Sequence, residues 1–589
     1  MCGIVGYIGG KQAQSILLNC LSRLEYRGYD SCGIAIRGSG IKVHKDAIRV
    51  KALQKTSPSF EGTLGIGHTR WATHGQPCQR NAHPHLDCSH RIAVVHNGVI
   101  TNYQKLRQQL TDEGHKFVSE TDTEVIPHLI EKYYQGNLEK ALEAAMNELE
   151  GSYALAVVVE DERKLIVARK DSPLVIGVGD GESIIASDVP AILDYTNRVI
   201  YLENGDIGVV TDEGIKITRN GTEIQRKEQR ILWNMEDVQK AGYEHYMLKE
   251  INEQPRVMRD TLRECLESNV HLSMNGSPRN LAIVACGTSY HAGLVGKYMT
   301  EELLGIPVRV TVASEFNHCG QPPGSTAAIV ITQSGETADV LKAMKRLHEA
   351  GVHTLVITNV PGSTASRIGD QIVYTRAGPE VSVAATKTFL AQLVVLYQLN
   401  LSYYGANNRG FKELMSEFLQ LPGKVQQVLD NEYQVASAAR YLSRYEDVFF
   451  IGRGINVPIA LEGALKLKEI SYIHAEGCPA GELKHGAFAL LSHEAPVIAI
   501  AAPDSTYSAM LTSIKEVKAR NAPVIALADD SDEAIAELAD TVIRVPHVNP
   551  IFSPVVNAVV MQLLAYHAGR YRGCPVDFPR NLAKSVTVE

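Results

Sequence analysis

The second residue of the chain is a cysteine, within the run Met1–Gly6. Removal of the initiator methionine, which is common before a small residue, would leave Cys2 with its thiol and a free α-amino group. Because an α-amino group titrates near pH ~8, it can accept the proton of the thiol at neutral pH. Cys2 would then be nucleophile and general base together. The alternative is a small apolar residue that starts a strand.

Polar clusters elsewhere in the N-terminal half suit the binding of a charged substrate. The run Gly67–Gly75 reads either as a polar loop or as a site in which Arg70 clamps a carboxylate with two hydrogen bonds. Asn97 and Gly98 follow an apolar strand, where they form either a tight turn or a pair of oxyanion donors. Asp122 lies where a helix is expected to begin, so helix capping is its alternative role.

A second set of polar residues lies in the C-terminal half. The run Thr332–Thr337 falls between an apolar strand and a helical pattern, where hydroxyls and N–H groups meet a positive helix end. This arrangement suits a phosphate monoester, although an ordinary helix cap has the same composition. It is not a P-loop, because the glycine spacing and the following lysine are missing. Thr288 and Ser289 occupy the equivalent loop one strand earlier.

Charged residues near the end of the chain could perform chemistry on a sugar. Glu462, Lys466 and Glu469 are spaced i, i+4 and i+7, which places them on one helix face, either solvated or facing a site. His485 follows in a polar loop. Lys584 lies six residues into the final run, where a lysine normally belongs to a frayed tail. A desolvated lysine could instead form an imine with a ketose.

Composition limits the class of protein. The chain has 589 residues, enough for about three domains, with 45% hydrophobic and 21% charged residues and a net charge of -8. The absence of a basic block argues against nucleic acid, and the lack of a ~20-residue apolar run or a signal peptide indicates a cytoplasmic protein without membrane contact. The ten cysteines occur singly, with no CxxC pair and no close Cys/His cluster, so the sequence indicates neither disulfides nor a zinc site.

Two kinds of secondary-structure pattern must position these residues. Up to residue 230, short strand-like runs alternate with turns and two helical patterns, which predicts an α+β fold with antiparallel sheets. After a polar, aromatic stretch, the pattern becomes strand, glycine turn, helix, and it occurs twice. We therefore predict two doubly wound α/β domains with parallel sheets and a break near residues 405 to 435. Strands are expected at 92–95, 154–159, 165–168, 281–284, 327–331, 448–451 and 497–500, and helices around 11–25 and 121–150.

The motifs of the first half occur together and in one order: CGIVGYIG, YRGYDS, GHTRWATHG, HNG and SETDTE. In this the chain resembles the N-terminal-nucleophile glutamine amidotransferases. The resemblance implies that Cys2 attacks the glutamine side-chain amide, forms a thioester and releases ammonia. Asn97 and Gly98 would hold the oxyanion, while Arg70 and Asp122 would bind the α-carboxylate and the α-amino group. The remaining glutamine-site residues would be Arg27, Trp71, Thr73 and His74, with Trp71 also gating an ammonia channel.

The second half resembles a tandem pair of sugar isomerase (SIS) domains, and the whole chain is similar to the isomerising glutamine–fructose-6-phosphate aminotransferases. The resemblance implies conversion of L-glutamine and D-fructose 6-phosphate to glutamate and D-glucosamine 6-phosphate, the first step of hexosamine synthesis, without metal or redox cofactor. Lys584 would form the Schiff base, and Glu469, near Lys466, would move a proton between C1 and C2. His485 would assist ring opening from the partner in a homodimer. The sugar phosphate would be held by Thr288, Ser289, Thr332, Gln333, Ser334, Thr337, Val383 and Ala384.

The same resemblance gives the expected domains. They are a type 2 glutamine amidotransferase domain (1–230), a connector (231–250), the first and second SIS domains (251–430 and 431–580) and a C-terminal active-site tail (581–589). The chain departs from the family pattern at Ala385, where a serine is expected, and at Thr332, where serine is common. Loss of the Ala385 hydroxyl could cost ~1 kcal/mol of sugar binding.

Three alternatives stay open on sequence alone. A glutaminase coupled to another acceptor, as in phosphoribosylpyrophosphate amidotransferase or asparagine synthetase, is disfavoured by the SIS repeats. An enzyme of the same class could act on another keto-sugar phosphate. SIS domains also occur in regulators that only sense phosphosugars, but such a protein would have no use for Lys584 or Glu469.

Overall fold

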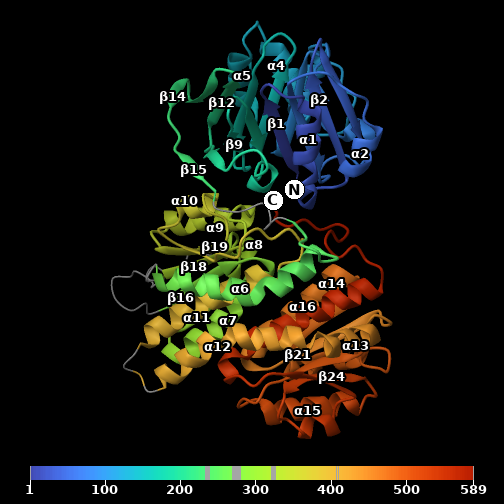
Figure 1. Ribbon diagram of the computed structural model, residues 1–589, viewed down its shortest axis with the longest axis vertical. Coiled ribbons are helices and arrows are strands. Elements are labelled where there is room, and N and C mark those ends of the chain that lie inside the picture. Colours follow the sequence, from blue (N-terminus) through green and yellow to red (C-terminus); the bar gives the residue numbers. More distant parts are fainter. Residues whose placement is uncertain are drawn as a thin grey trace. The chain divides into compact units, whose positions relative to one another are not determined.

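The computed structural model describes residues 2–231, 239–267, 280–319, 327–405, 408 and 410–587 (Figure 1). The chain divides into two compact units, one of residues 1–238 with 585–589 and the other of residues 239–584. Within the expected connector, residues 232–238, which include Trp233, lie outside the described residues. The two units are described separately below.

The N-terminal unit contains two antiparallel sheets, as the sequence predicted. The first has eight strands, in the order β15 (Glu228–Arg230), β11 (Arg198–Tyr201), β9 (Val175–Val178), β10 (Ser183–Ala186), β1 (Gly3–Ile8), β4 (Leu64–Arg70), β2 (Ser31–Arg37) and β3 (Ile41–Asp46). The second has seven, in the order β14 (Thr222–Ile224), β13 (Gly214–Arg219), β12 (Asp206–Thr211), β8 (Leu165–Lys170), β7 (Gly151–Val159), β6 (Ile92–Ile100) and β5 (His85–Leu86).

Strand β6 shows why these sheets form layers. Successive side chains of a strand point to opposite faces, and on β6 both faces are apolar. Ile92 and Val94 belong to a core that includes residues of the helices, while Ala93 and Val95 belong to a core that includes β1 and β4 of the other sheet. The central strands β6, β7 and β8 of the second sheet are therefore buried on both sides. The helices of this unit are α1 (Ala13–Ser22), α2 (Val50–Thr56), α3 (Tyr103–Asp112), α4 (Val125–Tyr133) and α5 (Leu138–Glu148).

The C-terminal unit contains two five-stranded parallel sheets with the same strand order, which confirms the predicted duplication. The first runs β17 (Val308–Val312), β16 (Leu281–Ala285), β18 (Ala327–Thr332), β19 (Thr354–Thr358), β20 (Gln371–Tyr374). The second runs β22 (His474–Pro479), β21 (Asp447–Gly452), β23 (Val497–Ala501), β24 (Val524–Asp529), β25 (Thr541–Val545). In chain order each sheet reads 2-1-3-4-5, the doubly wound arrangement whose ligand crevice lies between strands 1 and 3.

Helices between the two sheets join the repeats into one core (Figure 1). The region near residues 405 to 435, where the sequence indicated a break, is largely helical, and Phe418, Leu421 and Val425 are buried in that core. The core helices are α6 (Tyr246–Glu267), α7 (Gly287–Leu304), α11 (Lys387–Tyr404), α12 (Phe411–Asp430), α13 (Glu432–Leu442), α14 (Val457–Ser471) and α16 (Ser553–Tyr571). The others are α8 (Ala313–Phe316), α9 (Ala338–Glu349), α10 (Thr364–Ile368) and α15 (Tyr507–Lys518).

One helical segment of the described chain, Pro550–Tyr571, is long and apolar enough to cross a membrane, although the sequence predicted no such run. Its most apolar window is completely buried inside the protein. A helix that is apolar on every face is expected in the middle of a core. Burial among the other helices therefore accounts for its composition.

Candidate active sites

Cys2 lies directly before β1 and contacts the main chain of Trp71. The Trp71 N–H donates to Cys2 Sγ at 3.2 Å, and Sγ lies 3.4 Å from the Trp71 carbonyl oxygen. Burial raises the pKa of the Cys2 thiol, although the Trp71 N–H and the positive charge of Arg70 act in the opposite direction. A thiol in this state needs a base before it can act as a nucleophile.

Asn97, on β6, is held by His68 and reaches back to Cys2. The Asn97 Nδ2 donates to the Cys2 carbonyl oxygen at 2.9 Å. His68 Nε2 lies 3.1 Å from Asn97 Oδ1 and 3.0 Å from the His96 carbonyl oxygen. Since both partners are acceptors, Nε2 must carry the proton. Burial lowers the pKa of His68 to about 3, so the ring is neutral. His68 thus fixes which end of the Asn97 amide faces Cys2, a role that sequence reasoning missed.

Gly98 adopts a backbone conformation that other residues rarely reach. Its φ is +131°, and a Cβ atom at this position would lie 2.1 Å from the Ser152 carbonyl oxygen on β7. Glycine is therefore required here both by conformation and by space. The close approach of β6 and β7 explains why glycine follows Asn97.

Arg70 and Asp122 are both almost completely buried. Arg70 Nη2 donates to the carbonyl oxygens of His74 and Gly75, whereas Nη1 is buried and has no hydrogen-bond partner among the described residues. Asp122 Oδ2 accepts from the Ile100 N–H at 2.8 Å, and Oδ1 lies 3.9 Å from His74 Nδ1. A buried unpaired guanidinium nitrogen and a buried carboxylate are complementary to the two charged groups of an amino acid.

Other predicted glutamine-site residues differ in their surroundings. Trp71 and His74 are half-buried, and Thr73 is exposed. Arg27 forms an ion pair with Asp188, which also accepts a hydrogen bond from the Tyr26 hydroxyl. This buried pair links Arg27 to the fold, so its part in glutamine binding stays a prediction.

The predicted phosphate loops follow β16 and β18, which are neighbours in the sheet and are its strands 1 and 3. In the loop after β18, the Gly335 N–H donates to Thr332 Oγ1 and the Glu336 N–H donates to Ser334 Oγ, both at 3.2 Å. Gly335 has a φ of +67°, and a Cβ there would lie 2.1 Å from Ser363 Oγ. The loop is therefore held by its own hydrogen bonds and leaves no space for a side chain at position 335.

The other predicted sugar-phosphate residues lie in the same unit. Thr337 is the N-terminal cap residue of α9, although its side chain makes no capping bond. Ser289 Oγ accepts from Gln392 at 3.0 Å, and the Gln333 carbonyl oxygen accepts from the Asn359 N–H at 3.1 Å. The structure places these residues at the crevice edge of the sheet, while their contact with phosphate stays a prediction.

Thr288 points to the helix that carries the predicted proton-transfer residues. Its hydroxyl donates to Glu462 Oε1 at 3.0 Å, and His291 Nδ1 lies 2.6 Å from Glu462 Oε2. Lys466 Nζ lies 3.5 Å from Glu462 Oε1 and 2.6 Å from Glu469 Oε2. The shared helix face was predicted correctly, and the structure makes it a buried network that joins the two repeats. Burial opposes ionisation of Lys466, but the two carboxylates raise its pKa.

Lys584 is not part of a frayed tail, because its side chain is only 5% exposed and forms an ion pair with Glu380. Glu380 is completely buried and also accepts from the Thr386 N–H at 2.9 Å and the Thr388 hydroxyl at 2.7 Å. Burial opposes ionisation of Glu380, but the charge of Lys584 holds its pKa below the ordinary value. Sequence reasoning missed Glu380, three residues before Val383.

A second buried carboxylate, Glu250, supports the same loop. It accepts from the Val381 N–H at 2.6 Å, and both burial and the charge of Glu380 raise its pKa. Val383 and Ala384 are buried, and the Val383 N–H donates to the Asp577 carbonyl oxygen at 3.1 Å. None of these contacts needs a hydroxyl on residue 385. Glu250 lies about 130 residues before the loop that it holds, so no sequence signal connects the two.

His485 stands apart from this network. It ends a short helix at Ala480–His485 and is exposed to solvent. In the described part of the chain no hydrogen bond or ion pair joins it to Lys584 or Glu469. The structure therefore does not bring His485 to the other predicted catalytic residues within one chain.

Comparison with known proteins agrees with this division. Residues 68–194 match the family model described as a glutamine amidotransferase domain, and residues 277–402 and 441–569 match the SIS domain. Proteins named glutamine--fructose-6-phosphate aminotransferase [isomerizing] from Caldanaerobacter subterraneus and Methanosarcina acetivorans are 47% and 48% identical to this chain, with 100% of both chains covered in each case.

A solved structure shows the same relationship for the second half. The C-terminal domain of glucosamine-fructose-6-phosphate aminotransferase from Francisella tularensis aligns with a TM-score of 0.54 at 35% identity, over 58% of this chain and 99% of that chain. Full-length identity near one half, together with both domain matches, settles the family. The chain belongs to the isomerising glutamine–fructose-6-phosphate aminotransferases.

Proposed function

We propose that this protein converts D-fructose 6-phosphate and L-glutamine into D-glucosamine 6-phosphate and L-glutamate. The observation that carries the proposal is the buried Lys584, paired with Glu380 beside the loop of Val383 and Ala384. A buried lysine is suited to attack a ketone, and a regulator that only binds phosphosugars has no need of it. The names of the full-length relatives support the same reaction.

In the glutaminase half, Cys2 is the nucleophile. After removal of Met1, the α-amine takes the thiol proton and Sγ attacks the side-chain carbonyl carbon of glutamine. The second N–H of Asn97 Nδ2 and the Gly98 N–H stabilise the oxyanion. Ammonia leaves with the proton from the amine, and water hydrolyses the thioester to glutamate. Arg70 Nη1 binds the α-carboxylate and Asp122 binds the α-amino group.

In the sugar half, Lys584 Nζ attacks C2 of the open-chain ketose and water leaves, which forms an imine. Ammonia then displaces the lysine. Glu469 removes a proton from C1 and a proton returns to C2, so that C2 keeps the amine and C1 becomes the aldehyde carbon. Electrons are only redistributed within the sugar, so the step consumes no oxidant. Glu469 is partly exposed and held by the buried Lys466, which suits a group that must touch substrate.

The loops after β16 and β18 bind the phosphate through Thr288, Ser289, Thr332, Gln333, Ser334 and Thr337. Val383 and Ala384, which lie outside these two loops, complete the site. His485 acts from the partner of a homodimer, since it is exposed and, among the described residues, makes no hydrogen bond or ion pair with Lys584 of its own chain. We also propose that the reaction itself uses no metal or redox cofactor and takes place in the cytoplasm, without nucleic acid or membrane. An enzyme acting on a different keto-sugar phosphate is the second candidate, since Ala385 removes a hydroxyl from the sugar loop.

The test is incubation with both substrates, followed by identification of the amino sugar by mass spectrometry and NMR. Glucosamine 6-phosphate supports the proposal, and a different amino-sugar phosphate favours the second candidate. Lys584→Arg should keep glutamine hydrolysis and lose at least ~10³-fold of amination, because an arginine cannot form the imine. Cys2→Ala should lose glutamine hydrolysis. Undiminished amination by Lys584→Arg would rule out the imine.

A further inference from the structure

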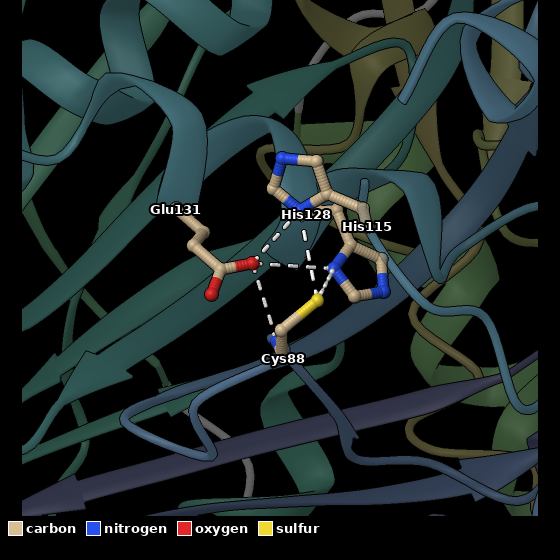
Figure 2. A group of neighbouring side chains, drawn as sticks. All are labelled: Cys88, His115, His128 and Glu131. Atoms are coloured by element: carbon tan, nitrogen blue, oxygen red, sulfur yellow. Dashed lines mark hydrogen bonds and ion pairs between the residues drawn. The ribbon is translucent and has the colours of Figure 1, made fainter. Parts of the chain in front are cut away.

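Four side chains with metal-binding atoms meet in the N-terminal unit (Figure 2). Cys88 lies in the turn between β5 and β6, and His115 follows the C-terminal end of α3. His128 and Glu131 lie one turn apart on α4. One ligand atom from each residue lies within 4.8 Å of all the others. The four residues come from three segments of chain, so the fold and not local sequence brings them together.

The distances fit a tetrahedral ion. Cys88 Sγ lies 3.7 Å from His115 Nδ1 and 3.5 Å from His128 Nδ1. Glu131 Oε2 lies 2.9 Å from His115 Nδ1 and 3.4 Å from His128 Nδ1. Zinc bonds of ~2.0 to 2.3 Å in a tetrahedron place their ligand atoms ~3.3 to 3.6 Å apart. Of these four distances, the one of 2.9 Å would have to lengthen by a few tenths of an ångström, and the other pairs of ligand atoms lie within 4.8 Å.

We propose that Cys88, His115, His128 and Glu131 bind a structural Zn²⁺ ion. One thiolate, two neutral imidazoles and one carboxylate carry two negative charges, which neutralise the ion. Thiolate and imidazole ligands together favour Zn²⁺ over Mg²⁺ or Ca²⁺. With four protein ligands the coordination is closed, as in structural rather than catalytic zinc sites.

Two further observations suit Cys88 and His128 as ligands. The Lys116 N–H donates to Cys88 Sγ at 3.3 Å, so the main chain holds the sulfur in place. His128 is buried on α4. Its far nitrogen, Nε2, lies 4.0 Å from Glu124 Oε1 and has no hydrogen-bond partner in the described chain. A carboxylate behind a histidine ligand is a common second layer of zinc sites.

The sequence indicated no zinc site, because the cysteines occur singly and no CxxC pair is present. The structure differs because the packing of α4 against the second sheet brings His128 and Glu131 to Cys88, and the segment after α3 adds His115. A Cys88 that is exposed at the surface gives the ion a direct path from solvent. Zinc at this position would tie the β5–β6 turn to both ends of the segment 115–128.

That segment contains Asp122, so zinc binding has a predictable effect on glutamine use. Fastening both ends of a loop lowers the entropy that it loses when it is ordered around a ligand. In the protein that keeps Cys2, we expect removal of zinc to raise the KM for glutamine several-fold with a smaller change in kcat. This second readout rests on the proposed function, whereas zinc binding itself does not.

The test uses the full chain carrying Cys2→Ala, which removes one further partly exposed thiol of this unit that could bind metal. After incubation with ZnCl₂ and removal of the excess, elemental analysis should give one zinc per chain. Replacement by Co²⁺ should give the intense visible bands of a tetrahedral site and a thiolate-to-cobalt band in the near ultraviolet. Cys88→Ser in the same background should lose the thiolate band and most of the zinc.

Two further variants make the result unambiguous. Cys574→Ser, which changes a cysteine of the other unit, should keep both zinc and spectrum. His115→Ala, outside any helix or strand, should weaken zinc binding at least ~10-fold while the circular dichroism stays unchanged. Less than one zinc per chain in the Cys2→Ala protein, or a thiolate-to-cobalt band that persists after Cys88→Ser, would overturn the proposal. Neither result depends on any activity, so failure here is distinct from failure of the proposed reaction.

Discussion

At the scale of single residues, the most informative contact is the one from His68 to Asn97. An asparagine amide can present either its oxygen or its nitrogen to a neighbour. The neutral His68 ring donates to Oδ1, so Nδ2 is left to face Cys2. We infer that His68 positions the proposed oxyanion donor through Asn97, while its second contact, to the His96 carbonyl oxygen, fixes the ring.

We predict that His68→Leu lowers kcat for glutamine hydrolysis by ~10²-fold, near the loss expected when an oxyanion donor is removed. KM should change little, because Arg70 and Asp122 still hold the substrate. Asn97→Ala should have a similar effect, and the double variant should be no worse than Asn97→Ala. His68→Gln, which keeps a donor, should recover part of the rate. Additive effects in the double variant would contradict this role.

Buried neutral histidines also predict how stability depends on pH. Burial lowers the pKa of His68 to about 3, and those of His83 and His85 well below the ordinary value. Below pH ~6.5 these rings bind protons in the unfolded chain but not in the folded one, so stability falls as pH falls from ~6.5 toward ~3. His68 alone would cost ~2 kcal/mol at pH 5. Thermal unfolding of the N-terminal unit, followed at pH 7.5 and 5, should show the loss, and a transition independent of pH would refute it.

At the scale of elements, the sequence predicted the strands and the loops after them better than the distant residues that contact those loops. The apolar runs at β6, β16 and β18 were found because a buried strand requires them, and the motif residues after those strands were placed with them. Glu250 and Glu380 were missed because the fold alone brings them to the lysine at the end of the chain. A contact between residues far apart in the sequence produces no periodic pattern from which it could be predicted.

The loop after β18 gives a prediction with a matched control. Gly335 and Gly351 have nearly the same φ, +67° and +68°, but a Cβ at Gly335 would meet Ser363, whereas one at Gly351 would meet nothing within 4 Å. Both Gly→Ala changes should cost ~1 kcal/mol of stability from the backbone alone. Only Gly335→Ala should also raise KM for the sugar phosphate, by ~10-fold or ~1.4 kcal/mol. Equal KM values in the two variants would show that the loop does not bind phosphate.

At the scale of the whole molecule, the two predicted SIS repeats are present, each with a parallel sheet, and helices between the sheets join them in one core. The strand–turn–helix period and the parallel sheets were predicted correctly, because a parallel strand with a helix on each face has a clear pattern. The junction was harder to predict, since α12 packs on α6 before it and on α16 of the second repeat, and so belongs to both. Amphipathic helices near residues 405 to 435 look the same whether they separate two cores or complete one.

Two compact units predict two unfolding transitions in calorimetry of the full chain. Fructose 6-phosphate should raise the transition of residues 239–584 only, by the equivalent of ~2.7 kcal/mol at 100 times its Kd. Glutamate, as a product of the other half, should raise the remaining transition. Limited proteolysis during the temperature scan would assign each transition to one of the two units. A single transition raised equally by both ligands would contradict independent unfolding.

The buried helix α14 has a consequence for the history and engineering of the duplicated half. It packs on α16, contacts α7 of the other repeat through Glu462, and carries Lys466 and Glu469, which we propose for the sugar site. Once one helix serves both copies, neither copy can be exchanged or diversified alone. A chimaera that swaps a single repeat between relatives should aggregate, whereas a swap of residues 239–584 as one block should remain folded.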